Sequence, residues 1–202
     1  VRKKAMEDFL SARKAIYYKK WQEALDTLDK VQEDNTAPDM LDEILYWKAY
    51  SLFKLSRDIK AEDLRLEKLK RALEYLDRLS KTFSTGEWVD DGQLLELEIW
   101  HRMNELGEKK YLDRIRELAE GEKEDISLKL AALDVLARLE PKTALPILKP
   151  VLFDHPDPEM RKKALLVLSR CPTLETIEIL QQIYDDDKDP GVRARAAMML
   201  RK

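Results

Sequence analysis

Apolar residues recur along the whole chain at helical spacing, and no segment alternates steadily between apolar and polar residues. This pattern predicts an all-α protein of about eleven helices without strands. The expected helices span residues 3–19, 22–34, 40–56, 62–83, 91–106, 109–121, 126–139, 142–153, 158–170, 173–185 and 190–201. Because most connections between them are short, consecutive helices are expected to be antiparallel neighbours.

The last third of the chain repeats itself every 32 residues. Four columns keep this register: Asp125, Asp157 and Asp189; Lys129, Arg161 and Arg193; Ala132, Ala164 and Ala196; Leu136, Leu168 and Leu200. Each Asp is expected to cap a helix, because its carboxylate accepts hydrogen bonds from the free amides of the first turn. Pro158 and Pro190 suit the first helical position, where an N–H is not needed.

A second apolar segment precedes each of these helices in the same register, with Ile115, Ile147 and Ile179 aligned. Each unit is therefore predicted to be a helical hairpin with a short polar turn. The second and third copies read D-P-x-[MV]-R-x-x-A-x-x-x-L. This signature resembles that of HEAT repeats in a short form, and the resemblance implies three stacked hairpins over residues 107–202.

The first half of the chain follows a different spacing. One copy of its pattern contains Ala12, Ala15, Trp21, Ala24, Leu28 and Val31, and a second copy begins at Tyr46 and resumes at Leu69. A charged insertion over residues 57–68 is expected to lengthen the turn or to extend the second helix. The pattern resembles tetratricopeptide repeats, although Lys19 and Ser56 stand where that family has a glycine. The resemblance implies tetratricopeptide-like pairs over residues 1–106, a seam at Gly107, and one rigid right-handed α-solenoid.

Two aromatic stripes lie at matching helical spacing, one in each of these copies. The first contains Phe9, Arg13 and Tyr17, and the second contains Tyr46, Tyr50 and Lys54. The tetratricopeptide resemblance implies that all six line a concave groove that binds an extended or helical peptide. Tyrosine and arginine often carry the binding energy of interfaces. The alternative is that the aromatic residues only fill the spaces between helices.

A basic ladder is expected on successive helices of the 32-residue repeats, formed by Lys129, Arg161 and Arg193. In HEAT-type repeats this position commonly pairs with acidic turn residues, so the resemblance implies a structural role. If the cations were unpaired and accessible, they would suit an acidic partner instead.

The chain offers few groups for catalysis or metal binding. His101 lies within a predicted helix and His155 in a predicted turn, and neither belongs to a metal-binding or catalytic motif. Cys171 has no second cysteine to pair with and is expected to be a buried, inert thiol. The acidic residues 185, 187 and 189 resemble a calcium loop only at its start, so they are expected to cap a helix. We therefore predict no enzyme, no cofactor and no metal.

The composition of the chain limits the kinds of partner that it is expected to bind. The 202 residues contain 37 basic and 40 acidic side chains, a net charge of −3, which leaves no surplus of positive charge for a nucleic acid. No stretch without charged residues approaches the roughly 20 residues of a membrane-spanning helix. The first residue is Val1, so the chain is expected to be a cloned fragment or a mature form.

Together these features predict a non-catalytic protein–protein interaction scaffold whose partner is a protein or peptide. The alternative is an enzyme-assisting HEAT-repeat protein such as a bilin-lyase-like subunit. Self-association through the C-terminal repeat is a further expectation, because the last helix pair leaves an apolar face uncovered unless the natural protein continues beyond it or forms a dimer. The combination of the two repeat types resembles bacterial proteins of the cell envelope, which implies the periplasm, with the cytoplasm as the alternative.

Overall fold

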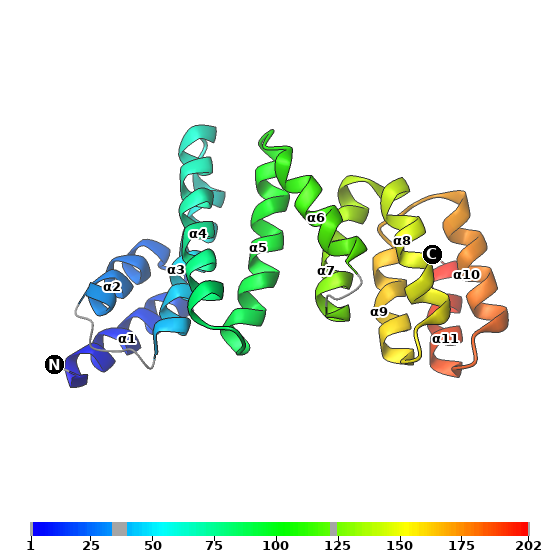
Figure 1. Cartoon of the computed structure of the whole chain (residues 1–202), viewed down its shortest axis with the longest axis horizontal. Helices are drawn as coiled ribbons and strands as arrows, with labels where there is room; N and C mark the ends of the chain where they lie inside the picture. The colour runs from blue at the N-terminus through cyan, green and yellow to red at the C-terminus, as the bar shows by residue number, and fades with distance from the viewer. Residues whose placement is uncertain (1, 34–39, 122–124, 202) are drawn as a thin grey trace. The chain divides into compact units, whose positions relative to one another are not determined.

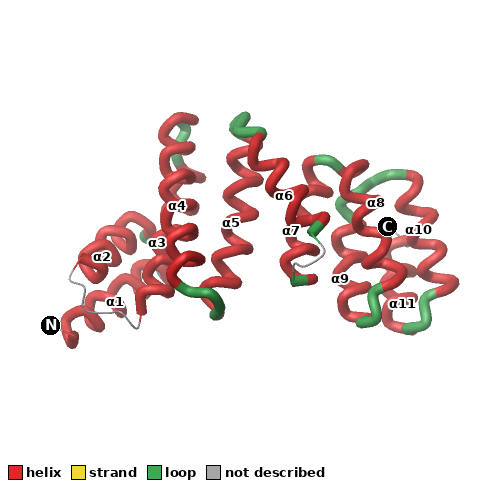
Figure 2. The backbone as a smooth tube through the Cα atoms, in the orientation of Figure 1, coloured by secondary structure: helices red, strands yellow, loops and turns green. Residues whose placement is uncertain are grey.

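The computed structural model describes residues 2–33, 40–121 and 125–201 of the chain. Within these ranges it contains eleven α-helices and no strand (Figures 1 and 2). The chain divides into two compact units, unit 1 over Val1–Glu108 and unit 2 over Lys109–Lys202. The eleven helices of the described ranges confirm the predicted fold class.

Five helices form unit 1: α1 (Arg2–Tyr17), α2 (Trp21–Glu33), α3 (Leu41–Asp58), α4 (Glu62–Thr82) and α5 (Glu87–Glu105). The central element is α3, which packs against α2, α4 and α5. Its buried residues include Ile44, Leu45, Ala49 and Leu52, so the helix is covered on several sides. A helix that is apolar over so much of its surface is expected at the centre of a bundle.

Lys48 is a buried cation in α3, only 2% exposed. Its Nζ lies 2.7 Å from the Asp29 carboxylate of α2 and 5.2 Å from the ring centroid of Tyr75 in α4. A lysine is seldom buried unless it is paired. The ion pair and the aromatic ring therefore fix α3 to the helices on two of its sides.

The start of α5 differs from the prediction. The apolar spacing predicts a helix from residue 91, but α5 begins at Glu87. Gly86 takes the cap position with φ 140°, a backbone conformation that favours glycine, and its carbonyl accepts the N–H of Asp90. Glu87 and Asp90 then lie in the first turn, where carboxylates stabilise the positive end of the helix.

Elsewhere the predicted helix ends lie within two residues of the observed ones, and the predicted end at residue 34 lies outside the described residues. The charged insertion mainly extends helices, since α3 continues to Asp58 and α4 begins at Glu62. Arg65 fixes the turn between them, because its Nε and Nη2 donate to the Ile59 carbonyl at 3.2 and 2.8 Å.

Six helices form unit 2: α6 (Lys110–Glu120), α7 (Ile126–Leu139), α8 (Pro141–Asp154), α9 (Pro158–Leu168), α10 (Leu174–Asp186) and α11 (Pro190–Leu200). They form the three predicted hairpins, with the second helices packed in the order α7, α9 and α11. The predicted caps are confirmed, since the carboxylates of Asp125, Asp157 and Asp189 each accept an amide hydrogen from the following first turn.

The 32-residue columns coincide with the contacts between hairpins. Ala132, Ala164 and Ala196 are fully buried, which permits the close approach of α7, α9 and α11. The second and third hairpins are also joined by a buried ion pair. Arg161 Nη2 and Nε each lie 2.8 Å from an oxygen of the Asp187 carboxylate, a two-point geometry that gives strong charge-assisted hydrogen bonds.

Removing the Asp187 carboxylate is expected to destabilise unit 2. Burial alone would raise the pKa of Asp187, but hydrogen bonds from Arg161 and from the Asp189 amide outweigh it and hold the pKa below its ordinary value. Asp187→Ala leaves Arg161 buried without its partner, so we expect a loss of about 2–4 kcal/mol in the free energy of unfolding, measured in urea at pH 7.

The matched control is Glu159→Ala, which breaks the exposed pair with Lys162 and should cost less than about 1 kcal/mol. Because the pKa of Asp187 is lowered, its contribution is present at neutral pH and is lost as the pH falls through that lowered value. Two results would contradict this role of Asp187. One is an equal loss of unfolding free energy in the two variants, and the other is a difference between the Asp187→Ala variant and the unchanged protein that stays constant as the pH is lowered.

Candidate functional site

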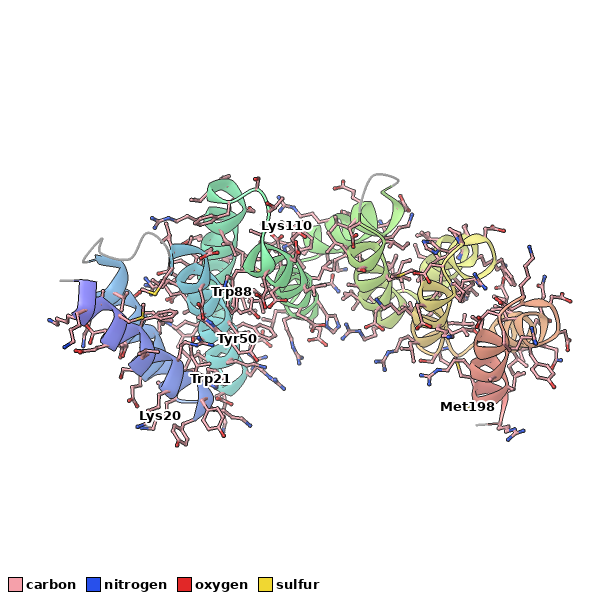
Figure 3. The ribbon with its side chains drawn as sticks, turned by 90° about the horizontal axis from the view of Figure 1, so that it is seen from below. Lys20, Trp21, Tyr50, Trp88, Lys110 and Met198 are labelled. Carbon is pink, nitrogen blue, oxygen red and sulfur yellow. The ribbon has the colours of Figure 1, made fainter. Side chains whose placement is uncertain are left out.

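Five aromatic side chains of unit 1 form one continuous surface, here called the aromatic patch: Trp21, Tyr46, Trp47, Tyr50 and Trp88. The ring centroids of Trp21 and Tyr50 are 5.7 Å apart, and those of Trp47 and Trp88 are 5.8 Å apart. In Figure 3, Trp88, Tyr50 and Trp21 are seen one below the other. All five rings are half-buried, so the patch is fixed by the fold yet offers part of each ring to solvent.

Three helices supply these rings. The i, i+4 spacing of Tyr46 and Tyr50 on α3 stacks their rings at 6.0 Å between centroids. Trp21 is the first residue of α2, and Trp88 lies in the first turn of α5, where its ring is 5.1 Å from that of Tyr46. The early start of α5 therefore places Trp88 on the patch.

The two ends of the patch differ in charge. At one end the Nζ of Lys54 lies over the Tyr50 ring, 4.8 Å from its centroid, which is a cation–π contact. At the other end Asp91 lies near Tyr46. Burial, the Asp91 charge and Tyr50 raise the pKa of Tyr46 to about 12, so its hydroxyl stays a hydrogen-bond donor at neutral pH.

The first predicted stripe does not join the patch as a whole. Phe9 is 3% exposed and packs in a core cluster with Ala12, Leu28 and Ile44. It therefore cannot line a groove, and its ring fills the space between helices instead. Arg13 is exposed and its Nε lies 3.6 Å from the Glu43 carboxylate.

Tyr17 lies at the end of α1 and is 79% exposed. Its ring contacts that of Tyr18 edge to face at 5.2 Å. Of the six predicted groove residues, the structure brings together Tyr46, Tyr50 and Lys54. Their role in binding stays a prediction.

The basic ladder has structural contacts in all three repeats. Arg161 Nη1 donates to the carbonyl oxygens of residues 155 and 156, and Arg193 Nη1 donates in the same way to those of residues 187 and 188. Lys129 Nζ donates to the Gly121 carbonyl at 3.4 Å. Arg161 is also buried against Asp187. These contacts favour a structural role for the basic ladder over the binding of an acidic partner.

The histidines and the cysteine lie in separate places. His155 occupies the α8–α9 turn, where its Nδ1 accepts the Asp157 amide at 3.2 Å. His101 is mostly buried in α5, with Nε2 3.8 Å from Glu105. Cys171 is buried, which raises the pKa of its thiol. Across the described ranges no three His, Cys, Asp or Glu side chains are grouped as a metal site.

The comparison with known families concerns the second half of the chain. The family model for HEAT repeats matches residues 112–201, which confirms that unit 2 is HEAT-like over this range. No curated protein and no solved structure matches the chain. The tetratricopeptide resemblance of unit 1 and the bilin-lyase-like alternative stay predictions. None of the described helices is both long and apolar enough to cross a membrane.

Proposed function

We propose that this protein is a non-catalytic scaffold that binds a peptide segment of a partner protein on the aromatic patch of unit 1. The observation that carries the proposal is the continuous, half-buried surface of five aromatic rings supplied by α2, α3 and α5. Large, rigid aromatic side chains give contact area at a small cost in conformational entropy. Their hydroxyl and indole groups add hydrogen bonds for a peptide backbone.

The HEAT-like part of the chain supports the same class of function. HEAT repeats generally act as protein-interaction scaffolds, and residues 112–201 match their family model. The rigidity of the aromatic patch also favours peptide binding without a large rearrangement of the protein. Lys48 and Asp29 fix α3 to α2, so the rings of Trp21 and Tyr50 are held in place before a peptide arrives.

Removing two rings of the patch is expected to weaken peptide binding. The double variant Tyr46→Ala and Tyr50→Ala should bind peptides at least about tenfold more weakly than the unchanged protein on a peptide array followed by fluorescence anisotropy. The control variant, Phe153→Ala, removes an exposed ring of unit 2 that lies outside both proposed binding surfaces. Equal binding by the double variant and by this control would contradict the assignment, provided circular dichroism shows that each is folded.

We further propose that two copies of this chain associate through the outer face of α10 and α11. Ile177 and Tyr184 on this face are 56% and 46% exposed, although their counterparts 32 residues earlier, Leu145 and Leu152, are buried. Equivalent positions have the same orientation within their own hairpin. The third hairpin packs against the second, whereas no described helix packs against the far side of the third. This accounts for the difference in exposure.

Charge on this face favours a second copy as the occupant. Arg161 binds the Asp187 carboxylate, but in the described part of the chain no carboxylate lies within 4.0 Å of the corresponding guanidinium of Arg193. Asp186 is an exposed carboxylate at the end of α10, in the turn that precedes Arg193. A twofold-related pair would make the Arg193–Asp186 contact twice and cover the apolar side chains of both copies.

Association is expected to depend on Ile177. Sedimentation velocity should show a dimer whose fraction rises with protein concentration, and Ile177→Asp should shift the protein to a monomer because a charge then replaces the apolar contact. Leu64→Asp is the control, since Leu64 of unit 1 is similarly exposed, at 52%. A monomer at all concentrations, or the same shift in both variants, would rule out this interface.

A further inference from the structure

A small basic pocket lies at the Trp21 end of the aromatic patch. It has a volume of about 420 Å³ and is here called the Lys19 pocket. Its lining comes from the α1–α2 turn, the start of α2 and the last turns of α3: Lys19, Trp21, Tyr50, Lys54, Arg57 and Asp58. The pocket therefore combines two aromatic walls with three cations and one carboxylate.

The three cations of the pocket have no acidic partner among the described residues. Neither Lys19, Lys54 nor Arg57 lies within 4.0 Å of a carboxylate there. The neighbouring Lys20 differs, since its Nζ lies 3.0 Å from Glu23. Three cations against the single carboxylate of Asp58 leave the pocket with a surplus of positive charge, which an entering anion neutralises.

The backbone at Lys19 gives a second, independent observation. Its φ is 58°, and within the described ranges no other residue except glycine has a positive φ. The turn is held by hydrogen bonds from the Lys19 amide to the Ile16 carbonyl and from the Lys20 amide to the Ala15 carbonyl, both 2.9 Å. Glycine adopts this conformation without strain, whereas lysine does not. A strained residue that also carries an unpaired charge into a pocket points to a functional role.

We propose that the Lys19 pocket binds the carboxylates of an acidic peptide segment. The inference rests on the proposed function, because the pocket shares Trp21 and Tyr50 with the aromatic patch. Carboxylates near Lys19 and Arg57 place the adjoining residues of the peptide against these two rings. The acidic segment thereby fixes the direction in which a peptide lies on the patch, with its less acidic part towards Trp88 and Asp91.

The test uses the full chain and two labelled peptides with the same aromatic and aliphatic residues, one flanked by four glutamates and the other by four lysines. In fluorescence anisotropy at low salt the acidic peptide is expected to bind at least about tenfold more tightly, and the difference should shrink as salt is added. Lys19→Gly and Lys19→Ala should each reduce the preference for the acidic peptide severalfold. Lys20→Ala removes one positive charge outside the pocket and should leave the preference unchanged.

Stability separates a binding role for Lys19 from a structural one. If the turn holds lysine at the expense of strain, Lys19→Gly should unfold about 2–4 °C above Lys19→Ala, while both lose the same affinity for the acidic peptide. A loss of stability in Lys19→Gly relative to the unchanged protein, with the acidic preference retained, would overturn the proposal.

The remaining outcomes distinguish this inference from the proposed function. If both peptides bind equally and the Tyr46→Ala, Tyr50→Ala variant weakens both, the patch binds peptides and the Lys19 pocket is not selective for acid. If neither peptide binds, both proposals fail. If free citrate or phosphate displaces the acidic peptide and binds as tightly as it does, the pocket takes a small anion, which contradicts the peptide assignment.

Discussion

The structure depends on one constraint, which is that a helical hairpin cannot bury its own apolar faces and must be covered by its neighbours. In unit 2 the constraint produces the 32-residue register, because a small alanine is needed wherever one hairpin meets the next. The buried pair of Arg161 and Asp187 is the polar part of that contact. In unit 1 it explains the central position of α3, whose side chains reach α2, α4 and α5.

The candidate site follows from the same constraint. The part of α3 that neighbouring helices leave open carries tyrosine, tryptophan and lysine, whose apolar bodies pack while their polar ends reach solvent. The first residues of α2 and α5 extend this surface with Trp21 and Trp88. The result is a rigid aromatic surface with cations at one end and Asp91 at the other, which suits a peptide with an uneven distribution of charge.

Features set by local chemistry could be predicted from the sequence, and features set by packing could not. The caps at Asp157 and Asp189 follow from the needs of free amides, and the structure has them. Phe9 and Tyr50 share the same helical spacing, so spacing could not separate the buried ring from the half-buried one. Trp88 was missed because Gly86 starts α5 early. Burial of Lys48 depends on Asp29 from another helix, which no local pattern indicates.

The indole N–H signals of the four tryptophans test the central claim most directly. Trp21, Trp47 and Trp88 belong to the aromatic patch, whereas Trp100 is buried in α5 and serves as an internal reference. In a ¹H–¹⁵N correlation spectrum titrated with the acidic peptide, the three patch signals should shift together along one binding curve while the Trp100 signal stays in place. Saturable binding that leaves all three patch signals unmoved would contradict the account.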